Sequence, residues 1–197
     1  MIAEDQTMVR QALVALLGLQ DDIAVVAEAA SGDEAIAMAS RYRPDVVLLD
    51  IEMPGPDGIE VARRLTAEGF GGKIVIVTTF GRPGYLAAAM AAGASGFLLK
   101  DAPAADLADA IRRVHAGERV VDPALAAAAL AEGASPLTAR ETEVLAAARS
   151  HEAITDLAGR LHLSQGTVRN HLSAAIQKLG ARNRAEAVQI AERKGWL

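Results

Sequence analysis

The chain has 197 residues, a formal net charge of −5 and 51% hydrophobic residues, which suits about two globular domains with apolar cores. It contains no cysteine, which excludes disulfides, thiolate zinc sites and cysteine nucleophiles. Because no apolar run reaches the ~18–20 residues that span a bilayer and no signal peptide is recognisable, we expect a cytoplasmic protein without membrane insertion.

The charge is divided unevenly along the chain. Residues 1–135 hold 11 basic and 19 acidic side chains, a net charge of −8, whereas residues 136–197 hold 9 and 6, a net charge of +3. An acidic part joined to a basic part predicts that only the second part meets a polyanion.

The first part alternates short apolar runs with amphipathic stretches of helical spacing. After a first run at Met1–Ala3, the Val-, Ile- and Leu-rich runs are Ile23–Val26, Val46–Leu49, Ile74–Val77 and Phe97–Leu99. Continuous apolar runs of this length are typical of strands that are buried on both faces of a parallel sheet. The pattern therefore predicts an α/β fold, a doubly wound five-stranded parallel sheet, whose functional residues lie at the carboxyl ends of the strands.

Polar side chains follow these strands. The first run ends at Glu4 and Asp5, the third at Asp50, the fourth at Thr78 and the fifth at Lys100. Clustered carboxylates repel one another unless a cation neutralises them, and oxygen ligands without His or Cys favour Mg²⁺ over zinc. A carboxylate that attacks a phosphoryl group needs such a metal, a hydroxyl and a second cation. Taken singly, each residue is better explained as an ordinary polar strand end, with Lys100 simply pairing with Asp50, but that explanation weakens when all five lie at strand ends.

Two stretches resemble the receiver domain of bacterial response regulators: residues 50–58 (DIEMPGPDG) its phosphoacceptor loop, and residues 92–101 (AGASGFLLKD) the run into its fifth strand. The resemblance covers the predicted first domain, residues 1–116, and implies a flavodoxin-like fold in which Asp50 is phosphorylated. It also implies Mg²⁺ binding by Glu4, Asp5, Asp50 and the backbone carbonyl of Glu52, with switch residues Thr78, Phe97 and Lys100.

One departure from the receiver pattern concerns the first strand. Only Met1–Ala3 precede the acidic pair Glu4 and Asp5, whereas receivers usually carry a longer apolar run there. Either the numbered chain lacks natural residues, or the strand is short and holds the acidic pair loosely, which would weaken Mg²⁺ binding. Residues 117–136 are expected to be a linker, either with a short helix around the alanine-rich stretch 123–132 or as a flexible tether.

Residues 137–197 have the pattern of a small all-α domain. Thr138 and Glu141 form a capping box at the first helix, residues 153–161 predict a second, Ser164 caps a third that runs to about residue 179, and Asn183 caps a fourth over residues 184–194. A helical wheel of the third helix separates two faces. The apolar face consists of Val168, Leu172, Ile176 and Leu179, and the polar face of Arg169, Asn170, Ser173 and Gln177.

The polar face suits DNA. Arg and Asn side chains make bidentate contacts with guanine and adenine edges, so Arg169, Asn170 and Ser173 are predicted to face bases. Thr167, Lys178 and Arg182 are predicted to contact phosphates. An ordinary solvated helix face is the alternative.

The motifs at residues 137–145 (LTARETEVL) and 163–171 (LSQGTVRNH) resemble the LuxR-type helix-turn-helix domain. Together with a receiver, this is the NarL/FixJ class of response regulators, and residues 78–85 and 192–196 resemble its DesR-type members. The resemblance implies that residues 164–179 form the recognition helix. It further implies a sensor histidine kinase, a double-stranded DNA promoter and a homodimer on activation. His151 stands where the family usually has glycine.

Two other functions remain open from the sequence. An aspartyl-phosphate phosphatase would use Asp50 as its nucleophile and a second acid two residues on, where Glu52 stands. A dimerisation module that ignores phosphorylation would fit a loosely held acidic pair.

Overall fold

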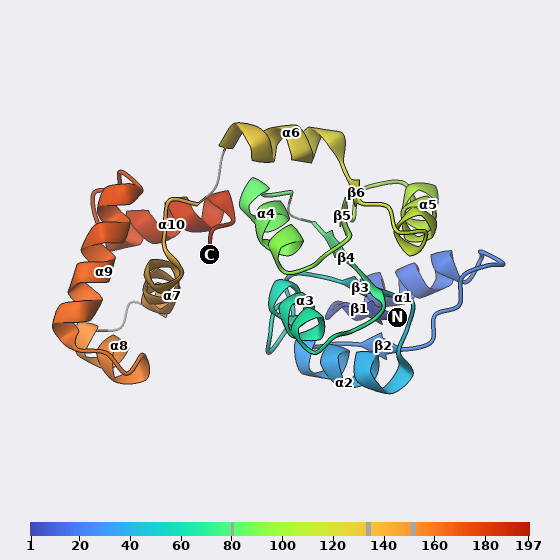
Figure 1. Cartoon of the computed structure of the whole chain (residues 1–197), viewed down its shortest axis with the longest axis horizontal. Helices are drawn as coiled ribbons and strands as arrows, with labels where there is room; N and C mark the ends of the chain where they lie inside the picture. Colours follow the sequence, from blue (N-terminus) through green and yellow to red (C-terminus); the bar gives the residue numbers. More distant parts are fainter. Residues whose placement is uncertain (80, 133–134, 151–152) are drawn as a thin grey trace. The chain divides into compact units, whose positions relative to one another are not determined.

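The computed structural model describes residues 1–79, 81–132, 135–150 and 153–197, and the chain divides into two compact units (Figure 1). The sheet unit comprises Met1–Gly81 and Leu86–Ala128, and the helical unit comprises Arg82–Tyr85 and Ala129–Leu197. His151, which stands where the LuxR-type domain usually has glycine, lies outside the described residues, as does Phe80 of the motif at residues 78–85. Among the helices of the described residues, none combines the length and hydropathy that crossing a membrane requires.

The sheet unit is built on a parallel sheet. Its strands are β1 (Ile2–Ala3), β2 (Glu28–Ala29), β3 (Val46–Leu49), β4 (Lys73–Thr78), β5 (Gly96–Leu99) and β6 (Val120–Val121). Their order is β2-β1-β3-β4-β5-β6, and every neighbouring pair is parallel. The first five strands follow the flavodoxin-like order, which confirms the predicted fold class.

The predicted second strand at Ile23–Val26 is wrong. The strand lies further along, at Glu28–Ala29, where it pairs with the two residues of β1 in the register Ile2↔Glu28 and Ala3↔Ala29. The side chains of Ile23 and Val25 pack against the hydrophobic core although their backbone joins no strand. Their apolar character therefore reflects burial of side chains and not pairing within the sheet.

The sheet also has one strand more than predicted. β6 forms within the segment expected to be a linker, where the N–H of Val120 donates to the carbonyl of Ser95 at 3.0 Å. Val120 is buried, so it extends the core beyond β5. The linker helix expected after it is present as α6 (Pro123–Glu132).

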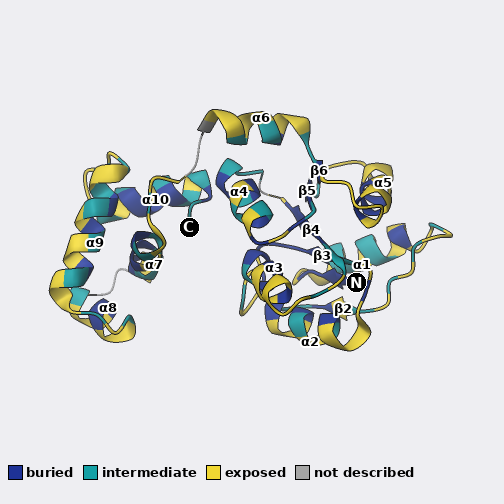
Figure 2. Ribbon diagram, viewed as in Figure 1, coloured by how far each residue is buried: buried dark blue, intermediate teal, exposed yellow. Residues whose placement is uncertain are grey.

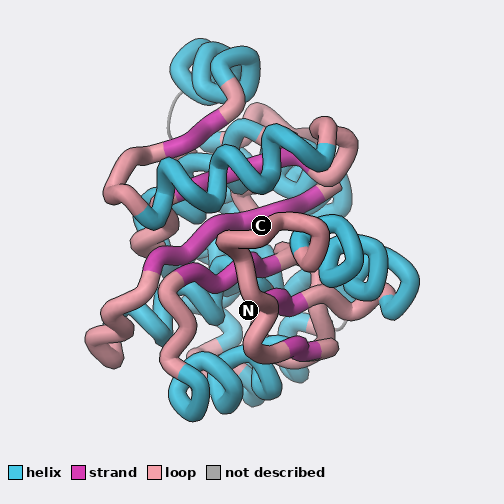
Figure 3. The backbone as a smooth tube through the Cα atoms, turned by 90° about the vertical axis from the view of Figure 1, so that its right-hand side faces the viewer, coloured by secondary structure: helices cyan, strands magenta, loops and turns pink. Residues whose placement is uncertain are grey.

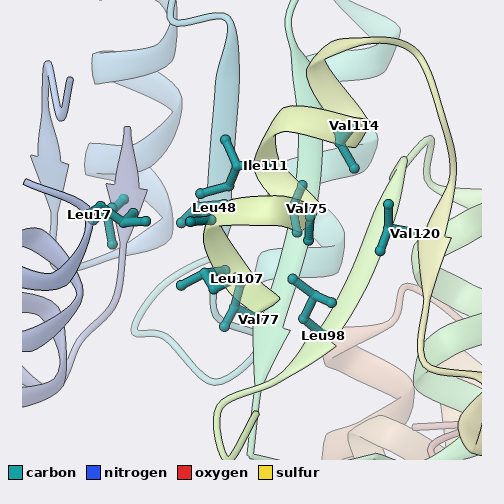
Figure 4. Close-up of a cluster of buried hydrophobic side chains, with 12 residues drawn as sticks. Leu17, Leu48, Val75, Val77, Leu98, Leu107, Ile111, Val114 and Val120 are labelled. Atoms are coloured by element: carbon teal, nitrogen blue, oxygen red, sulfur yellow. The ribbon is translucent and has the colours of Figure 1, made fainter. Parts of the chain in front are cut away.

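Helices cover both faces of the sheet (Figure 3). They are α1 (Thr7–Leu17), α2 (Gly32–Tyr42), α3 (Gly58–Ala67), α4 (Pro83–Ala91) and α5 (Ala104–His115). Against one face, α1 and α5 form a core in which alternate strand residues meet helix side chains (Figure 4). The labelled members of that core are Leu17, Leu48, Val75, Val77, Leu98, Leu107, Ile111, Val114 and Val120. Since successive strand residues point to opposite faces, the intervening residues lie on the other face of the sheet.

The helical unit contains a helix-turn-helix arrangement. Its elements are α7 (Ala139–Ala147), the 3₁₀ turn η1 (Ala148–Ser150), α8 (Ile154–Arg160), α9 (Gln165–Lys178) and α10 (Arg184–Lys194). The predicted caps are confirmed: Thr138 and Glu141 form a reciprocal capping box, and Ser164 and Asn183 accept hydrogen bonds from the backbone of Thr167 and Glu186. Figure 2 shows buried and exposed residues alternating along α9, as its wheel predicts.

An exposed ion pair joins α5 to the loop that follows α1. The Nε and Nη2 atoms of Arg112 donate to the two carboxylate oxygens of Asp22 at 2.7 and 2.8 Å. This hydrogen bonding lowers the pKa of Asp22 from 3.8 to about 2. Because the folded-state pKa is depressed, the pair stabilises the fold above the unfolded-state value and loses its effect as the pH falls toward 2.

We therefore expect the Asp22 carboxyl carbon to titrate near pH 2 in an NMR series, and Arg112→Gln to return its pKa toward 3.8. The loss of the paired guanidinium is the physical reason. A pKa for Asp22 that does not differ between the two proteins would contradict this assignment.

Candidate functional site

The carboxyl edge of the sheet brings together side chains from three strands. The Nζ atom of Lys100, which follows β5, lies 3.0 Å from Oδ2 of Asp50 after β3 and 2.6 Å from Oε2 of Glu4 after β1. Glu4 and Asp50 are buried, with exposed fractions of 1% and 4%, whereas Asp5 is exposed. Carboxylate oxygens of Glu4, Asp5 and Asp50 lie within 4.8 Å of one another. The convergence predicted from the strand ends is therefore present.

This cluster has an excess of negative charge. Burial raises the pKa of both Glu4 and Asp50, while the hydrogen bonds from Lys100 act to lower them. Burial acts to lower the pKa of Lys100, but its hydrogen bonds to both carboxylates outweigh that effect and raise it. Three carboxylates against one ammonium leave negative charge uncompensated, and this donor set of oxygens suits a hard divalent cation such as Mg²⁺.

The backbone around Asp50 holds its carboxylate in a defined orientation. The N–H of Ile51 donates to Oδ1 at 2.8 Å, and the N–H of Asp50 itself donates to the carbonyl of Ala3 at 2.9 Å. One carboxylate oxygen thus faces the backbone of its own loop, and the other faces Lys100.

Thr78 and Phe97, which the resemblance predicts to be switch residues, are both fully buried. They lie on the face of the sheet opposite Val77 and Leu98, because side chains alternate along a strand. The N–H of Lys100 donates to the carbonyl of Thr78 at 2.9 Å, so β4 delivers Thr78 to the same edge. Glu52 is exposed, and its carboxylate is not among the three that converge.

Two glycines and an arginine that support this edge were not among the predicted site residues. A Cβ atom on Gly58 would lie 2.0 Å from the carbonyl oxygen of Asp50, and one on Gly32 would lie 1.9 Å from that of Pro56. Arg10 donates to the carbonyl of Glu4. Gly58 is the last residue of the motif at residues 50–58, whereas for Gly32 no sequence signal existed, since its contact with Pro56 is tertiary. For Arg10 there was one, because a cation near a helix N-terminus is unfavourable without partners.

The Gly58 contact makes a stability prediction. We expect Gly58→Ala to lower the free energy of unfolding by about 1–3 kcal/mol, since the new methyl group must displace the backbone of the Asp50 loop. Urea denaturation measures the change. Gly71→Ala is the matched control, because a Cβ there meets no atom within 4 Å, and equal losses in the two variants would contradict the assignment.

In the helical unit, α9 presents the predicted polar face. Arg169, Asn170 and Ser173 are exposed, while Val168 and Leu172 are buried in the core. Arg169 is only lightly tethered, with Nη2 donating to Oε1 of Gln165 at 3.3 Å. The three side chains predicted to face bases are therefore available on one surface of a helix.

The first predicted phosphate contact, Lys178, has a partner within the protein. Its Nζ atom donates to both carboxylate oxygens of Glu141, at 2.7 and 2.9 Å, and therefore ties α9 to α7. This hydrogen bond lowers the pKa of Glu141, whose side chain is only 8% exposed. Sequence spacing placed Lys178 on an outer face, but it could not show that a buried carboxylate lies opposite.

The other two predicted phosphate contacts also have partners. The hydroxyl of Thr167 lies 2.8 Å from that of Ser164, within the cap of α9. Arg182 is 86% exposed in its side chain and pairs with Glu186 one helical turn away, at 2.9 Å. A surface pair of this kind contributes little to stability, so Arg182 remains able to exchange its partner for a phosphate.

Both parts of the chain match known protein families. Residues 1–112 match the family described as response regulator receiver domain, and residues 135–191 match bacterial regulatory proteins of the luxR family. Over its full length the chain is 48% identical to an uncharacterized transcriptional regulatory protein, YvfU, and 45% identical to the transcriptional regulatory protein DesR, both of Bacillus subtilis (strain 168). The alignments cover 98% and 97% of those two proteins.

Among solved structures, the response regulator ChrA of a heme-sensing two-component system is similar over the whole chain. It superimposes with a TM-score of 0.58 at 37% identity, and the match covers 100% of this chain and 96% of that one.

Proposed function

Because the chain belongs to the LuxR family of two-component response regulators, which bind DNA and regulate transcription, we propose that Asp50 is its phosphoacceptor. The observation that carries the proposal is the bridge of Lys100 between Asp50 and Glu4 at the carboxyl edge of the sheet. It supports a carboxylate that is kept beside a fixed cation and beside further acids, which is the arrangement that phosphoryl transfer to an aspartate requires.

In this proposal a carboxylate oxygen of Asp50 attacks the phosphorus of a phosphohistidine on a sensor histidine kinase, or of a small acyl phosphate. An O–P bond to Asp50 forms as the donor's P–N or P–O bond breaks, and the imidazole or the carboxylate of the donor leaves. Lys100 stays beside the phosphorylated Asp50 and pairs with the negative charge that the phosphoryl group adds. Glu4, Asp5, Asp50 and the backbone carbonyl of Glu52 would hold Mg²⁺, which when bound neutralises charge on the carboxylates and the phosphoryl oxygens.

The switch is proposed to begin at Thr78. Its hydroxyl moves toward the phosphoryl oxygens, and Phe97, on the neighbouring strand, turns into the space that is vacated. Both side chains are fully buried, so neither can move without repacking of its neighbours. Such coupling would carry a charge change at Asp50 to the surface of the sheet unit.

The output is proposed to be a homodimer on a double-stranded DNA promoter. Two copies of α9 would enter major grooves about one helical turn apart, with Arg169, Asn170 and Ser173 facing the bases. One copy makes few phosphate contacts and binds weakly, so self-association controls occupancy. We place this activity in the cytoplasm, on the basis of the DNA-binding half.

Two observations weigh against the alternatives left open by the sequence. A phosphatase with a second acid two residues after Asp50 would use Glu52, but that carboxylate lies outside the converging three. A module that ignores phosphorylation was favoured by a loosely held acidic pair, yet Glu4 is buried and bonded to Lys100.

We expect Asp50→Asn to abolish phosphorylation by a radiolabelled acyl phosphate in the presence of Mg²⁺, because the amide is a far weaker nucleophile than the carboxylate. Incorporated label is the measurement. Asp45→Asn is the matched control, since Asp45 precedes β3 at the opposite end of the strand that delivers Asp50. Undiminished labelling of Asp50→Asn would refute the proposal.

The same pair of proteins tests self-association. The molecular mass in solution should rise toward that of a dimer in the phosphorylated protein and stay unchanged in Asp50→Asn.

For DNA binding we expect three substitutions to change affinity, base preference and salt dependence in different ways, measured on a duplex selected from random sequence. Arg169→Ala should cost about 1–3 kcal/mol and relax preference at one base position. Arg182→Ala should weaken all duplexes alike and reduce the salt slope by about one.

Lys178→Met supplies the third signature of this series. It should lower the melting temperature and leave the salt slope unchanged, because Lys178 pairs with Glu141. A reduced salt slope in Lys178→Met would show instead that Lys178 contacts phosphate.

A further inference from the structure

We propose that Arg10 is a positioning residue for the cation site: it holds the loop that carries Glu4 and Asp5. The inference rests on the proposed function and concerns a residue that no strand-end pattern singles out. It starts from the shortness of β1, which has only two residues before the acidic pair.

The backbone of Glu4 is held on both sides. Its N–H donates to the carbonyl of Ala29, the last residue of β2, at 3.0 Å. Its carbonyl oxygen, which lies past the end of β1, accepts a hydrogen bond from Nη1 of Arg10 at 2.5 Å. Arg10 thus fixes the peptide group that joins Glu4 to Asp5.

The guanidinium of Arg10 connects three elements. It extends from the early part of α1, its side chain is 15% exposed, and its Nε atom lies 3.5 Å from Oε2 of Glu28 on β2. A planar group with several donors can satisfy a carbonyl and a carboxylate at once, which an ammonium on a flexible stem does less well.

The start of α1 depends on the same loop. Gln6, its N-cap residue, makes no side-chain capping bond, and the first turn of α1 contains no acidic residue. Instead, the N–H of Gln6 donates to Oε1 of Glu4 at 3.1 Å. Without Arg10, the carbonyl of Glu4 would lose its hydrogen bond and the backbone of Glu4 would be held on one side only, so the acidic oxygens would no longer keep their separation from Asp50.

The sign of the effect distinguishes positioning from electrostatics. A positive charge near the acidic cluster repels a divalent cation, so removing it should tighten Mg²⁺ binding if charge were the only effect. Positioning predicts the opposite, since partners that orient ligand residues typically contribute about 10–100-fold in metal affinity.

The experiment is calorimetric titration of the full chain with Mg²⁺, without a phosphoryl donor. We expect Arg10→Gln to weaken binding by about tenfold, and Arg10→Lys to weaken it by a smaller factor. Arg63→Gln, which removes the same charge from the exposed face of α3, is the matched control and should leave the affinity within about twofold. In metal-free protein, the amide of Gln6 should exchange faster in Arg10→Gln than in the unsubstituted chain.

Unchanged or tighter Mg²⁺ binding in Arg10→Gln would overturn the inference, and so would an equal loss in Arg63→Gln. If Arg10→Gln fails to fold by circular dichroism, Arg10→Lys decides by the same criteria. Failure of the unsubstituted chain to bind Mg²⁺ would overturn the proposed cation site itself, and the role of Arg10 with it.

Discussion

A single ammonium group placed between two buried carboxylates is the interaction on which the sheet unit's chemistry depends. Lys100 reaches both Asp50 and Glu4, although the three residues follow strands that are distant in the sequence. Burying an ion pair costs desolvation energy that the attraction only partly offsets. With Asp5 beside it, the cluster retains negative charge, so it is poised to gain a cation or to respond to a charged group.

The helical unit uses the same pair of residue types to a different end. Glu141 and Lys178 carry one charge each, and the carboxylate also accepts the N–H of Thr138 in the capping box. That pair is balanced, and its consequence is geometric, because it sets α9 against α7. The cluster around Lys100 keeps a net negative charge and can therefore bind a cation. The neutral pair of Glu141 and Lys178 only stabilises the packing of two helices.

Local rules made much of this molecule predictable. Caps at Ser164 and Asn183, the capping box at Thr138 and the two faces of α9 all depend on residues within one or two helical turns. The meeting of Asp50 and Lys100 was equally predictable, since parallel strands bring their carboxyl ends to one edge of the sheet. The second strand was misplaced because Ile23 and Val25 are apolar for packing and not for pairing.

The sequence by itself determined the alternation of strands and helices, the polarity of the exposed face of α9 and the acids that meet at one edge, because periodicity and strand order encode these. Only the tertiary structure decided which partners the charges take: Lys178 with Glu141, Lys100 with both Glu4 and Asp50, and Arg10 with the carbonyl of Glu4. Ion pairs and backbone contacts between distant segments depend on distances of a few ångströms. No spacing along a chain specifies those distances until its elements are packed.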